Sequence, residues 1–485
     1  MIPRKRYFYL ARVVLQNRTA LSLVTGHPDN AFDTSLVRDA NGLPALPGTA
    51  IAGVLRSLYS RLKGHDADAV NAVFGHAGPE GSEVSALQTS WGLIHSAQDR
   101  PVFGLQLGAE LDAMRGDPLL SMLLEDRYQR ERVRINHRGS ASDEGKFDRA
   151  VLPAGCRFSV ELTFESDQAD DAVWSELLGV LAHPMFRLGA NTHSGLGSVE
   201  VIRCLARVFD LHSADDARAF RELSPDLGEV EGLLACEPPV LSVPGCVGGA
   251  LELKPDDFYR FGGDQDPFEE AVERPADLLP RFEPTVSWQD GCGTLNPARL
   301  LIPASSIKGA LAHRFTWHYN ALSGVFAEDV LNDEGEEWDK NADCPGTRAL
   351  FGHVDDRNGR AGCLFIDDAT QTISRDDLQN LMHNAIDQFT GGVRRGMLFS
   401  EDMVASQRFP RVSILLDTER LEQSCRAEEA DLALVRQALA ASLEDLCEGR
   451  LALGAAASRG HGYFSGRLSD GALRRYLPLN TGGTL

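Results

Sequence analysis

The sequence lacks the features that would assign it at once to a membrane, secreted or metal-binding class of protein. None of its apolar runs approaches the roughly 18 residues that a membrane-spanning helix needs, and residues 1–16 lack a signal-peptide cleavage site. Its nine cysteines are scattered, odd in number and without a C-x-x-C pair, which favours reduced thiols over disulfides or a zinc site. Its 13 histidines show no metal-ligand or catalytic-triad spacing. We therefore expect a cytoplasmic protein that does not associate with membranes.

Basic residues are also scarce. The 48 Lys and Arg side chains are outnumbered by 70 Asp and Glu, which gives a net charge of −22 and argues against non-specific nucleic-acid binding. The charge is unevenly spread, because five basic residues and no acid precede Asp29, and five arginines with a single glutamate lie between Arg127 and Arg138. Each basic run fits a solvated face as well as a surface for a polyanion.

One stretch occurs twice and organises the chain. Residues 43–63 (LPALPGTAIAGVLRSLYSRLK) recur as residues 301–318 (LIPASSIKGALAHRFTWH). In both copies a proline precedes a hydroxyl residue placed to cap a helix, and apolar residues follow at helical spacing, so we predict a turn that leads into a helix. The corresponding residues are Pro47 and Pro303, Thr49 and Ser305, Ile51 and Ile307, Gly53 and Gly309, and Leu55 and Leu311.

Two features of these helices indicate a role in addition to packing in the core. Gly53 and Gly309 lower helix stability, so a glycine at the same place in both copies predicts close approach of another backbone. A helix start with free N–H groups, hydroxyls and, in the second copy, Lys308 is suited to bind a phosphate. An ordinary amphipathic helix with a good cap is the alternative.

Three further landmarks recur in the same order. Phe-Gly pairs follow both helices at Phe74 and Phe351, and the segment RVRINHRG is paralleled by NAIDQFTGGVRRGMLF. The glycine-rich turn GANTHSGLG at 189–197 matches GAAASRGHG at 454–462. Four landmarks in one order indicate an internal duplication.

Each copy combines its elements in the order strand, helix, strands, helix, glycine-rich turn, strand. β-Branched and aromatic runs predict the strands, and helical apolar spacing predicts the helices. This order is that of a ferredoxin-like βαββαβ unit, so we predict an α+β fold with two tandem modules and insertions. We place the first module at 1–208, an acidic linker with prolines and glycines at 209–249, and the second module at 250–485.

In combination and order, these motifs resemble the repeat-associated mysterious protein (RAMP) superfamily, the RNA-binding subunits of CRISPR effector complexes. The sequence is similar in particular to the backbone subunits of type III systems, with two modules fused in one chain. The resemblance implies a modified RNA-recognition-motif core in each module. It also implies that the partners are a guide RNA (crRNA), a target RNA and other effector subunits, including the large polymerase–cyclase subunit.

The resemblance further implies which side chains contact RNA. The helix starts, the basic run and the second glycine-rich turn supply hydroxyls, cations and N–H groups that suit phosphates. Ser194 takes the place of an arginine in the first turn, so weaker phosphate contact is expected there. The candidate RNA-binding residues are Thr49, Arg132, Arg134, His137, Arg138, Ser305, Ser306, Lys308, Arg394 and Arg459.

The family's target-cleaving modules carry an aspartate in the loop before the repeated helix, and the segment FDTSLVRD resembles that loop. Asp33 falls at this position, where a carboxylate helps to activate a ribose 2′-hydroxyl, directly or through Mg²⁺. The sequence identifies no ligand set for the metal. A turn-forming aspartate is the alternative, and we assign that role to Asp39. The second module has no clean match among Asp264, Asp266 and Asp290, so we expect it to hold guide RNA without cutting.

Three functions remain open from the sequence. The chain is a metal-dependent, guide-directed endoribonuclease subunit that acts through Asp33, a structural or end-capping guide-RNA-binding subunit without chemistry, or an acidic α+β protein whose duplication serves oligomerisation. Co-purification of a small RNA separates the first two functions from the third.

Overall fold

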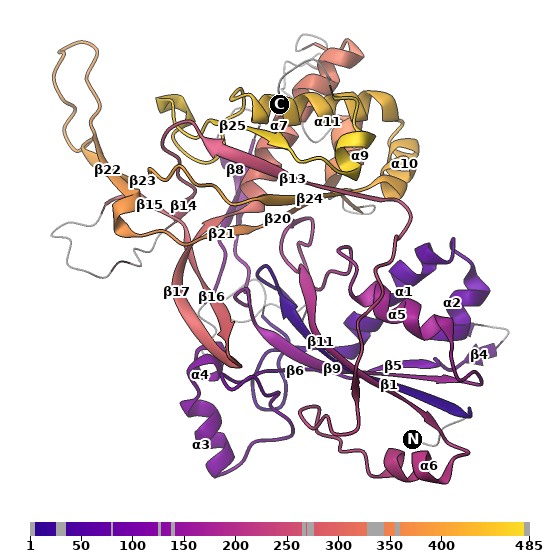
Figure 1. Cartoon of the computed structure of the whole chain (residues 1–485). Helices are drawn as coiled ribbons and strands as arrows, with labels where there is room; N and C mark the ends of the chain where they lie inside the picture. The colour runs from indigo at the N-terminus through magenta and orange to yellow at the C-terminus, as the bar shows by residue number, and fades with distance from the viewer. Residues whose placement is uncertain are drawn as a thin grey trace.

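The computed structural model describes residues 5–25, 35–78, 81–124, 128–136, 141–263, 268, 276–326, 344–354 and 359–479, and every structural statement below refers to them. The chain forms two α+β modules, the first in the lower half of Figure 1 and the second above it. None of the helices in the described ranges is long and apolar enough to cross a membrane.

The first module is built on an antiparallel sheet whose central strand order is β11-β1-β9-β6. Along the chain these are the fourth, first, third and second long or paired strands, which is the ferredoxin-like order. Short strands extend both ends of the sheet, and β5 pairs with β9. The strands are β1 (Tyr7–Asn17), β2 (Ala45–Leu46), β5 (Leu87–Thr89), β6 (Gly92–Ile94), β9 (Arg157–Ser166), β11 (Val199–Asp210) and β12 (Leu234–Ala235).

Helices cover one face of this sheet, where α1 (Gly48–Leu62) and α5 (Ala172–Leu181) enclose the main core. Tyr9 of β1 belongs to that core. Its neighbour Phe8 points to the other face, because successive residues of a strand face opposite sides. There Phe8 packs in a smaller cluster with α6 (Ala214–Arg221), which lies in the segment between the modules.

The second module repeats this architecture with the strand order β20-β24-β13-β25, again the second, third, first and fourth strands. Its helices, α7, α9, α10 and α11 among them, cover the upper face of its sheet (Figure 1). The repeated order confirms the predicted α+β fold of two tandem ferredoxin-like modules. The elements are β13 (Cys246–Pro255), β20 (Leu364–Asp367), β24 (Val412–Asp417), β25 (Phe464–Leu468), α7 (Ala304–Ser323), α9 (Pro345–Phe351), α10 (Thr418–Ala427) and α11 (Leu432–Cys447).

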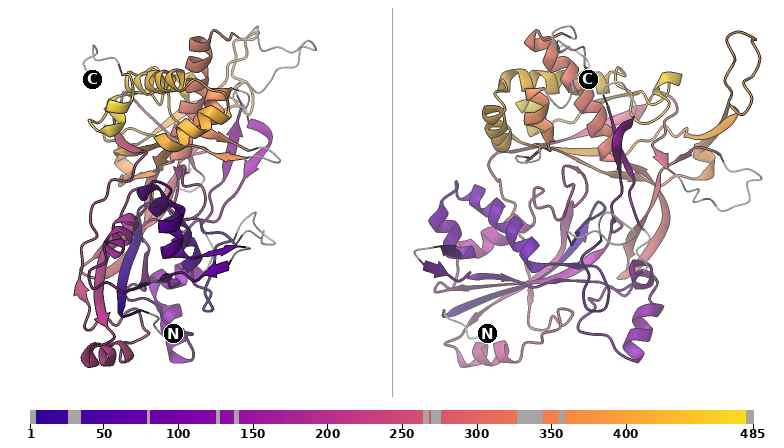
Figure 2. Two further views of the ribbon diagram at one scale, coloured as in Figure 1. Left: turned by 90° about the vertical axis from the view of Figure 1, so that its right-hand side faces the viewer. Right: turned by 180° about the vertical axis from the view of Figure 1, so that it is seen from behind.

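Each module extends a β-hairpin from the connection between its second and third sheet strands. In the first module, β7 (Arg132–Ile135) and β8 (Ala141–Phe147) form this hairpin, which runs up to the second module. In the second module, β22 (Leu378–His383) and β23 (Phe399–Val404) form a hairpin that projects away from both modules (Figures 1 and 2). The duplication thus places one hairpin against the second module and its counterpart away from both modules.

A third hairpin joins the modules. It consists of β16 (Phe282–Gln289) and β17 (Cys292–Ile302) of the second module and reaches down along the first (Figure 1). Nε1 of Trp288 donates a hydrogen bond to the carbonyl of Gly155 at 2.7 Å. The guanidinium of Arg157 lies over the Trp288 ring, 4.3 Å from its centre. The hairpin therefore fastens the second module to the first through an aromatic anchor.

The repeated stretches form α1 and α7, as predicted, but two details differ from expectation. The N-cap residues are Pro47 and Pro303, and neither supplies a side-chain hydrogen bond to its helix start. A Cβ atom added at Gly53 or Gly309 would meet nothing within 4 Å, so the predicted close approach of another backbone is wrong within the described part of this chain. The remaining elements are α2 (Ala67–Phe74), β3 (His76–Gly78), β4 (Gly81–Glu83), α3 (Ala109–Gly116), α4 (Pro118–Leu124), β10 (Ser194–Gly195), β14 (Gly262–Gly263), β15 (Leu279–Pro280), β18 (Gly352–His353), β19 (Arg360–Ala361), β21 (Ala369–Gln371), η2 (Arg375–Asp377), η3 (Ala457–Arg459) and α12 (Ala472–Tyr476).

Candidate nucleic-acid interface

The first glycine turn (residues 189–197) lies between the modules. Its strand β10 pairs in parallel with β20, the edge strand of the second module's sheet. Gly195 adopts φ +108°, and a Cβ there would overlap with the carboxylate of Asp368 and the side chain of Ala304. Glycine is therefore required at this position by both backbone conformation and space. The first glycine turn is part of the contact between modules.

The start of α7 is closed by the same contact. The N–H of Ala304, the first residue of the helix, donates to Oδ1 of Asp368 at 2.8 Å. A carboxylate of the chain itself thus takes the position that favours an anion at a helix start. Ser305 and Ser306 of this first turn are half-buried. The expected open phosphate site at these two serines is therefore not found, because Asp368 occupies the helix start.

Lys308 is also directed inward. Its side chain is buried, and Nζ donates to the carbonyls of His193 in the first module (3.2 Å) and Leu364 in the second (3.0 Å). Burial lowers the pKa of Lys308 to about 8. The expectation that Lys308 faces a phosphate is therefore corrected: its ammonium joins the two modules.

The basic run of the first module (residues 127–138) also contains an arginine that is directed into the contact between the modules. Arg130 is buried and donates to both oxygens of Glu283 (2.7 and 2.6 Å) and to Asp368, all in the second module. Burial lowers the pKa of Arg130, but the two carboxylates outweigh this effect and raise it. Arg130 is thus an ion-pair residue between modules, which corrects the prediction that the whole run faces RNA.

Arg132 lies next to this ion pair and is only partly enclosed. Its Nη2 donates to the carbonyl of Ser194 in the first glycine turn at 3.3 Å. Burial and the neighbouring Arg130 lower the pKa of Arg132 to about 10, so the guanidinium stays charged at neutral pH. The side chain of Arg134, and His137 and Arg138 entirely, lie outside the described residues.

Thr49 is exposed in the first turn of α1. Its helix start differs from that of α7, because Thr89 contacts it through a hydroxyl: Oγ1 of Thr89 donates to the carbonyl of Gly48 at 2.7 Å. The role of Thr49 stays a prediction.

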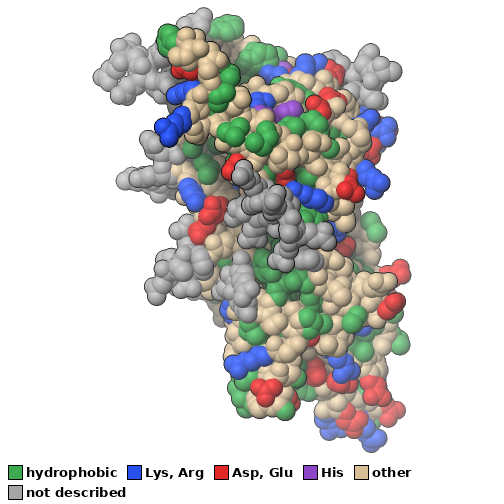
Figure 3. All heavy atoms as spheres, turned by 90° about the vertical axis from the view of Figure 1, so that its left-hand side faces the viewer, with side chains coloured by type: hydrophobic (Ala, Val, Ile, Leu, Met, Phe, Trp, Pro, Cys, Tyr) green, Lys and Arg blue, Asp and Glu red, His purple; other side chains and the backbone are tan. Residues whose placement is uncertain are grey.

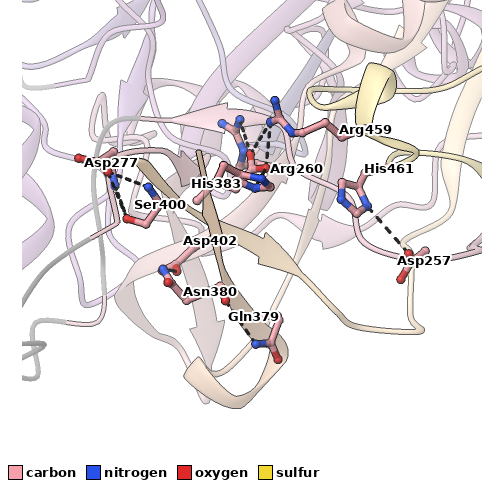
Figure 4. Close-up of polar contacts among 11 residues, drawn as sticks. Asp257, Arg260, Asp277, Gln379, Asn380, His383, Ser400, Asp402, Arg459 and His461 are labelled. Carbon is pink, nitrogen blue, oxygen red and sulfur yellow. Dashed lines mark hydrogen bonds and ion pairs between the residues drawn. The ribbon is translucent and has the colours of Figure 1, made fainter. Parts of the chain in front are cut away.

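The second glycine turn (residues 454–462) contains the candidate Arg459 and packs beside the foot of the β22–β23 hairpin. Nη2 of Arg459 donates to both carboxylate oxygens of Glu401, at 2.9 and 3.0 Å. Nη2 of Arg260 donates to the same carboxylate at 3.1 Å, and Nε2 of His383 lies 2.7 Å from it. We call Glu401, Arg260, His383 and Arg459 the Glu401 cluster; Figure 4 shows the three basic side chains converging from separate segments.

The Glu401 cluster combines one carboxylate with two guanidinium groups and an imidazole, so its net charge is positive. Burial raises the pKa of Glu401, but Arg459 and Arg260 outweigh this effect and lower it below its ordinary value. The carboxylate is therefore ionised at neutral pH. Sequence reasoning found Arg459 and missed the other three residues, although His383 directly precedes the NAIDQFTGGVRRGMLF motif and Glu401 follows it two residues after its end.

The tip of the β22–β23 hairpin carries exposed apolar and basic side chains. Phe389 is 88% exposed, and the candidate Arg394 is exposed while its N–H donates to the carbonyl of Ala385 at 2.9 Å. Other large apolar side chains of the hairpin are exposed as well, namely Met382, Ile386, Val393, Met397 and Leu398, and an exposed apolar patch normally marks a contact with a partner. Figure 3 views the side from which this hairpin projects, and apolar and basic side chains lie next to one another on the second module there.

The predicted cleavage residue Asp33 lies outside the described residues, as do Asp264 and Asp266. Asp39 is a turn former, as predicted, because its Oδ1 accepts from the N–H groups of Asn41 (2.9 Å) and Leu43 (2.8 Å). In the second module Asp290 adopts φ 51° at the tip of the β16–β17 hairpin. That segment serves as the fastening between modules.

Two tandem sheets in ferredoxin-like order, with hairpins and glycine turns at corresponding places, define a protein of two RNA-recognition-motif-like modules. The family model of the RAMP superfamily matches residues 22–200 and 297–465, which together are most of the chain. The chain belongs to the RAMP superfamily and has the CRISPR-associated RNA-binding role of that family. A search of curated proteins found no match.

Proposed function

We propose that this chain is a guide-RNA-binding backbone subunit of a type III CRISPR interference complex. The observation that supports this proposal most is the Glu401 cluster at the foot of the outer hairpin. Cations fixed beside a glycine-rich turn suit the phosphates of a nucleic-acid strand, since the backbone there approaches without a Cβ in the way. In a chain of net charge −22, such a local excess of cations indicates a surface that binds an anion.

The outer hairpin extends the proposed RNA surface. Arg459 and His383 at its foot contact phosphates, and Arg394 near its tip supplies a further cation. The apolar side chain of Phe389 stacks on or wedges between bases, an interaction that tolerates any sequence because every base has a π-face. This combination of contacts is suited to a guide whose sequence varies.

The first module contributes less to this surface in our proposal. Its glycine turn is enclosed between modules and carries Ser194 where the second turn has Arg459. Arg132 and Thr49 are its described candidates for phosphate contact. The guide therefore runs along the outer hairpin and the second glycine turn before it reaches the junction of the modules at Arg132.

Target cleavage through Asp33 is the finer part of the proposal. A carboxylate within reach of a ribose 2′-hydroxyl accepts its proton as the oxygen attacks the adjacent phosphate. Within the described ranges, no group of three or more His, Cys, Asp or Glu side chains is placed to hold a metal ion; Asp33 itself lies outside these ranges, and we derive no step through Mg²⁺.

A non-catalytic, end-capping role is the second candidate. It is favoured by the second module, where the segment before α7 forms the β16–β17 hairpin and packs on the first module. A chain that cuts once, or not at all, follows from that arrangement.

The test is to isolate the native complex without nuclease treatment, sequence any small RNA that co-purifies and supply a matched target RNA. Asp33→Asn should abolish one cut, whereas the matched control Asp290→Asn should leave every cut in place. If Asp33→Asn leaves every cut in place, this result would support the end-capping role instead. Absence of any co-purifying RNA would contradict both candidates.

A further inference from the structure

Glu401 lies at the centre of the proposed RNA surface without being able to touch RNA. Its side chain is 0% exposed, and its carboxylate meets side chains from three other segments within 3.1 Å. Two of them, Arg459 and His383, retain exposed surface, with side chains 35% and 21% exposed. Arg260 is only 7% exposed. The carboxylate therefore holds the cluster from inside.

The geometry at Arg459 leaves donors for a ligand. A guanidinium has five N–H bonds in one plane, and only Nη2 of Arg459 is used by Glu401. Among the described contacts, neither Nη1 nor Nε of this arginine donates a hydrogen bond within the chain. A side chain that is fixed along one edge by a buried carboxylate presents its other edge at little further cost in conformational entropy.

We propose that Glu401 is a positioning residue for RNA binding, which fixes Arg459 and His383 side by side so that the free donors of Arg459 and the imidazole of His383 face one phosphate segment. The inference rests on the proposed function, because it assigns the cations of the cluster to RNA. Glu401 acts as the buried ligand supports of binding sites do, by setting the orientation of the groups that touch the ligand.

A positioning role for Glu401 and a simple charge effect predict opposite changes in RNA affinity when Glu401 is replaced. Replacing Glu401 by glutamine removes a negative charge from a polyanion-binding surface, which by charge alone strengthens RNA binding. If Glu401 positions the cations, the same change releases Arg459 and His383 and weakens binding. The direction of the change therefore separates the two explanations.

The next residue provides a matched control. Asp402 is also 0% exposed, pairs with Arg375 at 3.1 Å and accepts from Asn380 Nδ2 at 2.7 Å. Because adjacent residues of β23 point to opposite sides, its carboxylate lies apart from Arg459 and His383, as Figure 4 shows. Asp402→Asn thus removes a buried, paired carboxylate from the same strand without touching the cluster.

The experiment measures binding of a labelled single-stranded RNA to the full chain over a salt series. We expect Glu401→Gln to weaken binding about tenfold near 0.1 M salt and to lower the slope of log K against log salt by about 0.7 for each phosphate that the chain no longer binds. Asp402→Asn should keep the slope, although it destabilises the fold by a similar amount. Glu401→Asp should restore part of the slope, since it keeps the charge.

A second single variant, Arg459→Gln, covers the case in which Glu401→Gln does not fold. Arg459→Gln changes a partly exposed side chain and leaves Glu401 paired with Arg260 and His383, so it should fold and show the reduced salt slope on its own. If Glu401→Gln folds, it should add little in the Arg459→Gln background. Tighter binding by Glu401→Gln, equal slopes for Glu401→Gln and Asp402→Asn, or an unchanged slope for Arg459→Gln would overturn the inference. Failure of the unmodified chain to bind RNA would instead overturn the proposed function, and the inference with it.

Discussion

The two glycine turns have the same motif and opposite surroundings. The first is enclosed between modules, where its strand β10 extends the sheet of the second module. The second lies beside the outer hairpin, and a Cβ at Gly460 would meet nothing within 4 Å. A duplicated sequence therefore does not mean a duplicated role, because the first glycine turn is buried in the contact between the modules and the second is not.

Ion pairs between the modules stabilise the contact that encloses the first glycine turn. In these ion pairs of the junction the first module supplies the cation and the second supplies the acid: Arg187 pairs with Asp367, and Arg61 pairs with Asp417. All four side chains are largely buried. The acidic residues of the second module thus receive partners within the chain, whereas Arg459 in the second turn keeps donors for an external anion.

The largest effect that tests this comparison is expected at Arg130. Arg130→Ala should lower the free energy of unfolding by about 3–5 kcal/mol, because it leaves the enclosed carboxylate of Asp368 without its ion-pair partner and removes the bidentate partner of Glu283. Urea unfolding at neutral pH measures the change. Arg18→Ala is the control, since Arg18 is 57% exposed and lies 4.0 Å from Glu200; it should have a much smaller effect. Similar unfolding midpoints for the two variants would argue against an ion-pair junction.

The next effect compares the glycine turns directly. Gly195→Ala should destabilise the chain by roughly 2–4 kcal/mol, because the new Cβ is forced against Asp368 at a positive φ. Gly460→Ala also has a positive φ, +89°, but open space, so its cost should be about 1 kcal/mol. Thermal unfolding of both variants provides the measurement. A larger loss in Gly460→Ala would mean that the second turn is the enclosed one.

Lys308 gives a smaller, pH-dependent effect. Its pKa is about 8 in the folded chain and 10.5 ordinarily, so between these pH values the unfolded state binds more protons and stability rises with pH. Lys308→Met should remove this rise, of order 2 kcal/mol between pH 8 and 10, and leave RNA affinity nearly unchanged. Urea midpoints at several pH values and RNA binding at neutral pH test both parts. A large loss of RNA affinity with an intact alkaline rise would restore Lys308 as a phosphate contact.

The smallest effect is expected at the outer hairpin. Arg394→Ala should lower the salt slope of RNA binding by about 0.7, the value for one phosphate contact on a single strand, without changing the unfolding midpoint. The exposed Arg18 again serves as the control, because it lies in the first module. Equal slopes for the two variants would separate Arg394 from the RNA surface.

The fold could be predicted from sequence because strand and helix periodicities are local and the landmarks repeat in order. Asp39 was assigned correctly for the same reason, since an aspartate before Asn-Gly acts on its neighbours. Lys308 and Arg130 were misplaced because their partners, Leu364 and Glu283, lie far along the chain. The Glu401 cluster was incomplete for this reason too: no local pattern connects four segments around one buried carboxylate.

The central claim is that RNA lies on the second glycine turn and the outer hairpin, and that the first glycine turn is closed to it. Photocrosslinking of a bound single-stranded RNA to the full chain, with the crosslinked peptides identified by mass spectrometry, tests this most directly. We predict crosslinks within 378–404 and 454–462 and none within 189–197. Crosslinks concentrated in 189–197 and at the start of α7 would contradict the account.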